Sequence, residues 1–180
     1  MALRNNILLI KSILPLMMFC GVFGSLNAQQ IKGDIREGNR LFKAEKFEDS
    51  EIAYRKAIDG EASSIPGNFN LGGALYRQEK FEEAEKQFTM VSRQNTSRDV
   101  QAGAFHNLGN SYLQAGKLDE AIDAYKDALR RNPGDMETKY NLAYAQNLKK
   151  QQEQQQQQNQ DQDNQDNQDN QDKQNQDQQN

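Results

Sequence analysis

Three glycines lie inside segments that otherwise have the composition of helices. Gly38, Gly72 and Gly109 are 34 and 37 residues apart, within the segments REGNRLFKAEKFEDSEIAYRKAI, NFNLGGALYRQEKFEEAEKQF and FHNLGNSYLQAGKLDEAIDAYKDALRRNP. A glycine in a helix interior costs about 1 kcal/mol relative to alanine. The recurrence of this costly residue at similar spacing indicates that each helix has to approach a neighbour closely at that position.

The sequence around these glycines divides into three units of 34 residues, over 31–64, 65–98 and 102–135, with three extra residues at 99–101. In each unit, two runs of apolar residues at helical spacing flank a short turn, for example Gly116-Lys117 in the third unit. A single short amphipathic helix is not stable in water. The two helices of a unit must therefore pack on each other, and each unit must pack on the next.

The second helix of each unit carries the residues expected to meet the glycines. We expect small residues to face the glycines directly and aromatic rings to fill the space around each crossing. The small residues are Ser50, Ala84 and Ala121, and the rings later in the same helices are Tyr54, Phe88 and Tyr125.

After the third unit, the segment METKYNLAYAQNLKK at 136–150 resembles the first helix of another unit, but no second helix follows. We therefore predict an all-α stack of three helix-turn-helix repeats, closed by a capping helix over 136–150. Residues 151–180 are almost entirely Gln, Asn and Asp, without apolar side chains, so the tail is predicted to be disordered beyond Asn159. An aggregation-prone segment and a weak divalent-cation binder are the alternatives for this tail.

The first 28 residues have the pattern of an export signal. A positively charged start precedes an apolar run over 13–23, and small Ala28 ends the segment. We predict a signal peptide, cleavage after Ala28, and a mature chain in the periplasm or cell envelope. One alternative is an uncleaved membrane anchor that starts at Ile7, although Lys11 interrupts it. Lipidation of Cys20 is a further alternative.

The charge distribution and the scarcity of reactive side chains exclude several function classes. The net charge is −4, but residues 29–150 carry 19 basic and 19 acidic residues and no basic stripe, which argues against nucleic-acid binding. The sole cysteine lies in the predicted signal, and His106 is the sole histidine. Gly-rich phosphate loops and Ser/His/Asp constellations are absent from the sequence. We therefore predict no catalytic residues, metal, cofactor or small-molecule substrate.

The third unit resembles a tetratricopeptide repeat (TPR) along its whole length. Its signature positions hold Leu108-Gly109, Tyr112, Gly116, Ala121, Tyr125, Ala128 and Pro133. The second unit matches at Leu71-Gly72, Phe81, Ala84 and Phe88, and the first departs further, with Glu37 and Ser50 at apolar positions. The resemblance covers residues 31–148 and implies a curved TPR α-solenoid whose concave face binds a peptide or partner helix.

In a TPR array the concave face is lined mainly by the first helix of each repeat. The resemblance therefore implies a groove lined by Ile35, Asn39, Phe42, Lys43, Phe69, Tyr76, Arg77, His106, Asn110, Leu113, Gln114, Tyr140 and Tyr144. Aromatic anchors with adaptable polar neighbours suit peptide recognition. Asn39 and Asn110 are candidates to bond a partner's backbone, and Lys43 and Arg77 to meet a carboxylate. The alternative is that the apolar members of the set complete the packing between adjacent repeats.

TPR co-chaperones hold a C-terminal carboxylate with a clamp of lysine, asparagine and arginine. Here Asn39 is in place, but Ile35 stands at the first lysine position, and Gly103 and Asn107 stand at the lysine and arginine positions of the third repeat. This argues against a receptor for chaperone tails.

A narrower resemblance is to the exported TPR proteins of bacterial aerotolerance (Bat) operons, of the BatC type. It rests on the export signal, the number of repeats, the run into a YNLAYAQ helix and the glutamine-rich end. It implies a cell-envelope role beside membrane-anchored von Willebrand A-type proteins. The leading hypothesis is a non-enzymatic protein-binding scaffold. A self-associating structural protein, or an accessory subunit that positions substrate for a partner hydrolase, are the alternatives, and the oligomeric state stays open.

Overall fold

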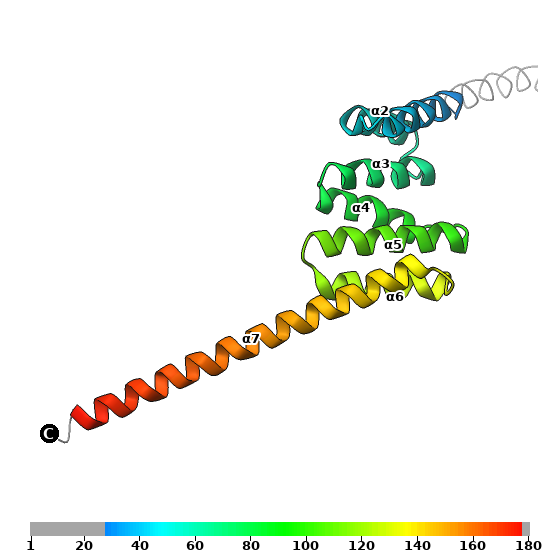
Figure 1. The fold of residues 1–180 in the computed structure, drawn as a ribbon. Coiled ribbons are helices and arrows are strands. Elements are labelled where there is room, and N and C mark those ends of the chain that lie inside the picture. Colours follow the sequence, from blue (N-terminus) through cyan, green and yellow to red (C-terminus); the bar gives the residue numbers. More distant parts are fainter. Residues whose placement is uncertain (1–27, 178–180) are drawn as a thin grey trace, which may run out of the picture.

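The structure, a computed structural model, describes residues 28–177, with side chains described up to residue 160. These residues form helices joined by short connections, and no strand occurs among them. The first helix covers residues 28–43. It is followed by α2 (Phe47–Gly60), α3 (Ile65–Arg77), α4 (Phe81–Ser92), α5 (Arg98–Gln114), α6 (Leu118–Arg131) and α7 (Met136–Asp177). The helices form three stacked hairpins, with α7 packed on the last of them (Figure 1). The predicted all-α stack is confirmed.

The three hairpin turns share one backbone conformation. Glu45, Glu79 and Gly116 have φ angles of 57°, 61° and 75°, at equivalent positions two residues before the next helix. A positive φ suits glycine and strains residues with a side chain. Only the third of these turns uses the residue that this conformation favours, so the first two carry local strain.

The three repeated glycines lie where the two helices of each hairpin cross. A Cβ atom added to Gly38 would collide with the Tyr54 ring, and one added to Gly72 would lie 2.8 Å from the Phe88 ring. At Gly109 the ring of Tyr125 would be 2.6 Å away. These distances leave no room for a side chain, which explains the glycines.

The group over each glycine differs from the prediction. We expected small residues of the second helix to face the glycines. Instead, the three atoms nearest to each glycine belong to the aromatic ring that lies four residues after the expected small residue. The rings are almost fully buried, with 1% or less of Tyr54, Phe88 and Tyr125 exposed. Each ring thus packs directly against the bare backbone of a glycine, so the glycines accommodate rings rather than a second backbone.

The core runs continuously through the stack. One buried cluster joins Tyr54 and Phe88 to Leu71, Leu75 and Leu108 across the three hairpins. A second cluster closes the far end, where Ala145 of α7 packs against α6. Each helix therefore buries its apolar face against the helices that precede and follow it.

Polar pairs tie successive hairpins together away from this core. Lys80 bonds Glu51 of the preceding hairpin, Lys117 bonds Glu85, and Lys149 of α7 bonds Asp119. Burial by itself raises the pKa of the Glu51 carboxyl, but hydrogen bonds from Lys80, Arg55 and Gln78 outweigh burial and hold this pKa below its ordinary value. The carboxylate is therefore the stable form of Glu51 in the fold.

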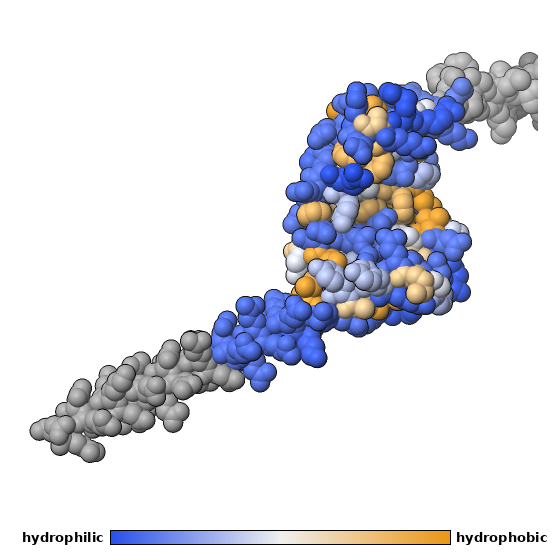
Figure 2. Space-filling model, in the orientation of Figure 1, coloured by the Kyte–Doolittle hydropathy of each residue, from blue (hydrophilic) through white to orange (hydrophobic). Residues whose placement is uncertain are grey.

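Helix α7 is longer than the predicted capping helix. It begins at Met136, as expected, but continues without a break to Asp177 and leaves the stack as a single projecting helix (Figure 1). The segment lacks glycine and proline, and glutamine is a fair helix former, so nothing in the sequence ends the helix at residue 150. Its surface beyond the stack is uniformly hydrophilic up to residue 160 (Figure 2). Disorder of the tail stays a prediction.

The N-terminal predictions concern residues that the structure does not describe. Apart from Ala28, the predicted signal peptide and its alternatives lie outside the described residues. Of the helices within residues 28–177, none is both long enough and apolar enough to span a bilayer.

Candidate functional site

A pocket of about 410 Å³ lies at the centre of the stack, where all three hairpins meet. We call it the central pocket. It is lined by Asn39, Phe42, Lys43, Tyr54, Phe69, Asn70, Gly73, Tyr76, Arg77, Phe88, Asn107 and Asn110. Most of these residues come from the first helix of each repeat, as the TPR resemblance implied. Hydrophobic surface gathers beside α3 and α5 in the space-filling view (Figure 2).

The aromatic walls of the central pocket are fixed by edge-to-face contacts. The ring centroids lie 5.3 Å apart for Phe42 and Phe47, and 5.8 Å apart for Phe69 and Phe88. Tyr76 meets a ring of α4 in the same geometry, at 5.5 Å. Phe42, Phe69 and Tyr76 are only partly buried. They therefore pack between helices and also present apolar surface to the pocket. The two roles considered for them, groove lining and packing between repeats, are thus compatible.

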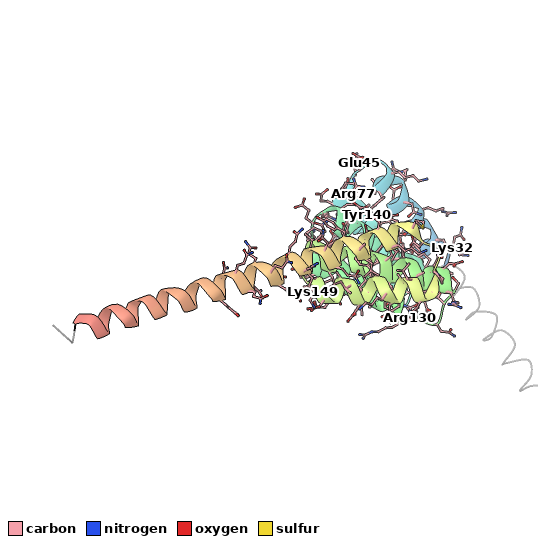
Figure 3. All side chains as sticks on the ribbon, turned by 60° about the horizontal axis from the view of Figure 1, so that its bottom comes forward. Lys32, Glu45, Arg77, Arg130, Tyr140 and Lys149 are labelled. Carbon is pink, nitrogen blue, oxygen red and sulfur yellow. The ribbon has the colours of Figure 1, made fainter. Side chains whose placement is uncertain are left out.

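One edge of the central pocket is positively charged. Lys43 and Arg77 are both exposed, and no carboxylate among the described side chains forms an ion pair with either. The Arg77 guanidinium lies 4.5 Å from the centre of the Phe47 ring, which holds it at the rim. Arg77 and Tyr140 project from the same edge of the stack, opposite Arg130 (Figure 3).

Two asparagines predicted to bind a partner's backbone are already bonded within the protein. The Asn39 Oδ1 atom accepts hydrogen bonds from the Tyr54 hydroxyl at 2.8 Å and from Asn70 Nδ2 at 2.9 Å. In the same way, Asn110 Oδ1 accepts from the Tyr125 hydroxyl at 2.8 Å and from Asn141 Nδ2 at 3.0 Å. We call each such set of one tyrosine and two asparagines a rung. The rungs join neighbouring repeats, so these carbonyl oxygens are not available to a ligand.

His106 belongs to the junction with α7 and lines neither pocket described here. Its Nδ1 lies 2.7 Å from the Thr138 hydroxyl, and its Nε2 lies 3.0 Å from Asn110 Nδ2. The Thr138 hydroxyl donates to Asp135, so His106 Nδ1 has to donate to Thr138, and Nε2 accepts from the Asn110 amide. His106 was predicted as a groove residue, and the structure instead makes it a polar link to the cap.

A second pocket, of about 480 Å³, continues the concave face toward α7. We call it the outer pocket. It brings together Tyr76, Asn110, Leu113, Gln114, Glu137, Tyr140, Asn141 and Tyr144. Tyr140 is 71% exposed and Tyr144 is 48% exposed, which is high for large rings. Glu137 makes this end of the concave face acidic, whereas the other end is basic.

Eleven of the thirteen predicted groove residues line one of these two pockets; Ile35 and His106 do not. The lining residues that were missed include Asn70, Asn107, Tyr54 and Phe88 in the central pocket and Glu137 and Asn141 in the outer pocket. Asn70 and Asn107 lie two positions before a repeat glycine, and that recurrence was visible in the sequence. The two rings were assigned to the core alone, although their edges also reach the pocket.

The pocket is suited to non-covalent contacts. Burial raises the pKa of Tyr54 to about 12, and burial, followed by the nearby Tyr76 and Glu137, raises the pKa of Tyr125 further. Both phenols are therefore neutral hydrogen-bond donors at physiological pH. No cluster of three or more metal-ligating side chains occurs among the described residues. What the site offers is aromatic surface, amide groups and two cations.

Comparison with known proteins decides the family. Models of the tetratricopeptide repeat match residues 35–95 and 102–135, together more than half of the chain. This chain is a TPR protein. No curated protein matches it.

Solved TPR structures have the same fold. The first TPR of Spaghetti (RPAP3), solved with an HSP90 peptide, is 24% identical, with 67% of this chain and 93% of that chain covered and a TM-score of 0.62. The second TPR domain of human RPAP3, solved with an HSP70 peptide, is 25% identical, with 67% and 98% covered and a TM-score of 0.60. The N-terminal domain of stress-induced protein-1 from C. elegans is 19% identical, with 67% and 97% covered and a TM-score of 0.60. The TPR array of this chain thus has the size of a complete domain of that kind.

Proposed function

We propose that this TPR protein is a non-enzymatic scaffold that binds a peptide segment of another protein along its concave face. The observation that carries the proposal is the central pocket, which is open, walled by fixed aromatic rings and bordered by Lys43 and Arg77. Neither of these cations forms an ion pair with a carboxylate among the side chains that the structure describes. Rigid aromatic surface and rim charges are the features that peptide-binding grooves use for affinity and specificity.

The solved relatives support this class of function. Two of them were solved with the peptides SRMEEVD and SGPTIEEVD, which are acidic at their ends. The basic edge formed by Lys43 and Arg77 suits an acidic segment as well. However, Ile35, Gly103 and Asn107 occupy the positions at which co-chaperones place clamp residues, so we propose a different acidic segment rather than a chaperone tail.

The test is capture of partners with groove variants. Lys43→Glu with Arg77→Glu, or Phe69→Ala with Tyr76→Ala, is expected to abolish recovery of partners crosslinked to the protein in native envelopes. Arg130→Glu is the matched control, because Arg130 lies at the opposite edge of the stack and is 64% exposed (Figure 3). Unaltered recovery with both groove variants would remove the proposal.

We further propose that the chain is exported and works in the cell envelope, within a membrane complex of the aerotolerance type that contains von Willebrand A-type proteins. The export-signal pattern and the BatC-like features of the sequence support this. Fractionation of cells, with the mass of the recovered chain, is the check. A mature chain that starts at Gln29 in the envelope fraction is expected, and a full-length chain in the cytosol would contradict it.

Self-association is the second candidate, and the exposed Tyr140 and Tyr144 on α7 favour it. An α7 face with two large exposed rings can pair with a second copy. Sedimentation over a wide concentration range separates the candidates: a strict monomer at high concentration excludes self-assembly. An accessory role that positions substrate for a partner hydrolase would use the same groove.

A further inference from the structure

The asparagine rungs follow the repeat, and the middle one is missing. In the first and third repeats, an asparagine directly after the repeat glycine accepts hydrogen bonds from a tyrosine fifteen residues later and from an asparagine of the next element, which is the second repeat in one case and α7 in the other. The middle repeat has Gly73 in place of the accepting asparagine and Phe88 in place of the tyrosine. Two of the three groups that form a rung are therefore absent at the centre of the stack.

The third group of that rung is still present. Asn107 is the equivalent of Asn70 and Asn141, the asparagines that donate in the other two rungs. Its side-chain amide makes no hydrogen bond to the described residues, and it lines the central pocket. An amide in this position can donate to one group and accept from another. The missing rung thus leaves a bidentate hydrogen-bonding group facing an opening.

Packing does not explain Gly73. A Cβ atom on Gly72 would collide with Phe88, whereas a Cβ on Gly73 would meet only Phe42, at an ordinary contact distance of 3.8 Å. The helix nevertheless carries glycine there, at a cost of about 1 kcal/mol relative to alanine. Since no close approach requires it, the effect of Gly73 is to keep the central pocket open.

We propose that the missing rung is a specificity site, at which the central pocket takes one aliphatic side chain of an extended, acidic peptide segment. The inference rests on the proposed function, because it names the ligand of the same groove. The aliphatic side chain enters the space left by Gly73, against Phe42, Phe69 and Phe88. The Asn107 amide bonds the adjacent backbone of the segment, and a neighbouring Asp or Glu side chain lies against Lys43 and Arg77.

The chemistry of the walls favours this occupant. The rings around Gly73 offer apolar edges, which suit a compact aliphatic side chain, and Phe88 carries no hydroxyl that would need a partner. A peptide backbone presents a carbonyl and an amide hydrogen at each residue, which is what a free asparagine side chain can satisfy. Lys43 and Arg77 line the same pocket and supply the charge complementarity.

The test restores the rung. Gly73→Asn combined with Phe88→Tyr recreates the pair found in the other two repeats, with Asn107 as the donor, and is expected to fill the pocket while keeping the fold. The matched control is Gly33→Asn, since Gly33 also lies in a first helix and has nothing within 4 Å. The restored variant is expected to melt at the same temperature as the parent or higher, which separates a filled pocket from a damaged one.

The probe is a displayed library of random dodecapeptides, selected on the full chain, with the enriched sequence then measured as a synthetic peptide by fluorescence anisotropy. We expect a consensus with one aliphatic residue close to Asp or Glu. Restoring the rung is expected to weaken binding about tenfold to a hundredfold, as loss of one buried aliphatic side chain implies. The Gly33→Asn control should bind as the parent does, and amidation of the peptide C-terminus should change little, since the proposed carboxylate is a side chain.

The outcomes separate this inference from the proposed function. Peptides that bind, lose affinity with Lys43→Glu and Arg77→Glu, but are unaffected by the restored rung would overturn the specificity site and leave the groove. A consensus without an aliphatic residue, or one that requires a free C-terminus, would also overturn it. If no sequence is enriched, or if neither set of variants affects binding, both the inference and the proposed function fail.

Discussion

Single glycines in this chain have two different structural roles. Gly38, Gly72 and Gly109 lie under aromatic rings, and their lack of a side chain is required by contact distances below 3 Å. Gly73 has no such contact and instead leaves space on the concave face. Adjacent glycines in one helix, Gly72 and Gly73, thus serve the core and the pocket respectively.

This difference gives a matched pair of substitutions. Gly109→Ala is expected to destabilise the fold by about 1–3 kcal/mol, because its Cβ would lie 2.6 Å from the fully buried Tyr125 ring. Gly73→Ala should be neutral or stabilise by up to about 1 kcal/mol, since it only gains helix propensity. Urea unfolding measures both, and equal effects at the two positions would contradict the assignment.

The sequence located these glycines but not every group that they meet. The repeat spacing predicted the crossings, whereas the rings of Tyr54, Phe88 and Tyr125 took the places expected for small residues. Residues on facing helices are staggered by several positions, and a periodic pattern does not define that offset. The asparagine rungs were not predicted for the same reason, because their asparagine donors lie 31 residues away, in the next repeat or in α7.

At the level of elements, the three hairpin turns share a left-handed backbone conformation, which glutamate, the residue in two of the turns, adopts only with strain. Glu45 and Glu79 have the positive φ angle that Gly116 adopts without strain. The repeat predicts a short turn at this place in each unit, but it does not predict the φ angle, since Glu gives no local signal for a left-handed conformation. Tertiary packing of the two helices imposes it.

The turn can therefore be improved. Glu79→Gly is expected to raise the free energy of unfolding by up to about 1 kcal/mol, because relief of the strain exceeds the added freedom of the unfolded chain. Gly116→Ala is the reverse change and should lower it by about 1 kcal/mol. Thermal unfolding of both variants is the measurement, and a loss of stability with Glu79→Gly would show that the Glu79 side chain matters more than its backbone.

At the scale of the whole molecule, the buried phenols make the stability of the stack depend on pH in the alkaline range. Burial raises the pKa of Tyr54 to about 12 and that of Tyr125 still higher, above the ordinary tyrosine value of about 10. Their contribution to stability is fully present below about pH 10 and is lost as the pH rises toward the folded-state values.

We therefore expect the free energy of unfolding to fall by at least about 2 kcal/mol between pH 10 and pH 12. Denaturant unfolding followed by circular dichroism at a series of pH values is the measurement. Combining Tyr54→Phe with Tyr125→Phe removes both phenols and should flatten this dependence, at the cost of two hydrogen bonds. A profile equally steep in the variant would assign the loss to other groups.

The order of the helices could be predicted from the sequence, and the length of the last one could not. Repeats 34 residues long leave few alternatives to stacked hairpins, and the missing second helix correctly marked α7 as the cap. The end of α7 depends on a glutamine run that gives neither an apolar stripe nor a helix stop. Of the site, the contribution of the first helices was predictable, while the hydrogen bonds that occupy Asn39, His106 and Asn110 required coordinates.

Helices in this stack pack against the elements next to them in the chain, and distant hairpins barely touch. Such a linear arrangement opens from its ends inward, since an end hairpin loses one interface and an inner hairpin loses two. Residues from all three hairpins line the central pocket. A ligand held there would contact hairpins that otherwise contact only their neighbours. Its binding would therefore slow amide exchange in the first and last hairpins together.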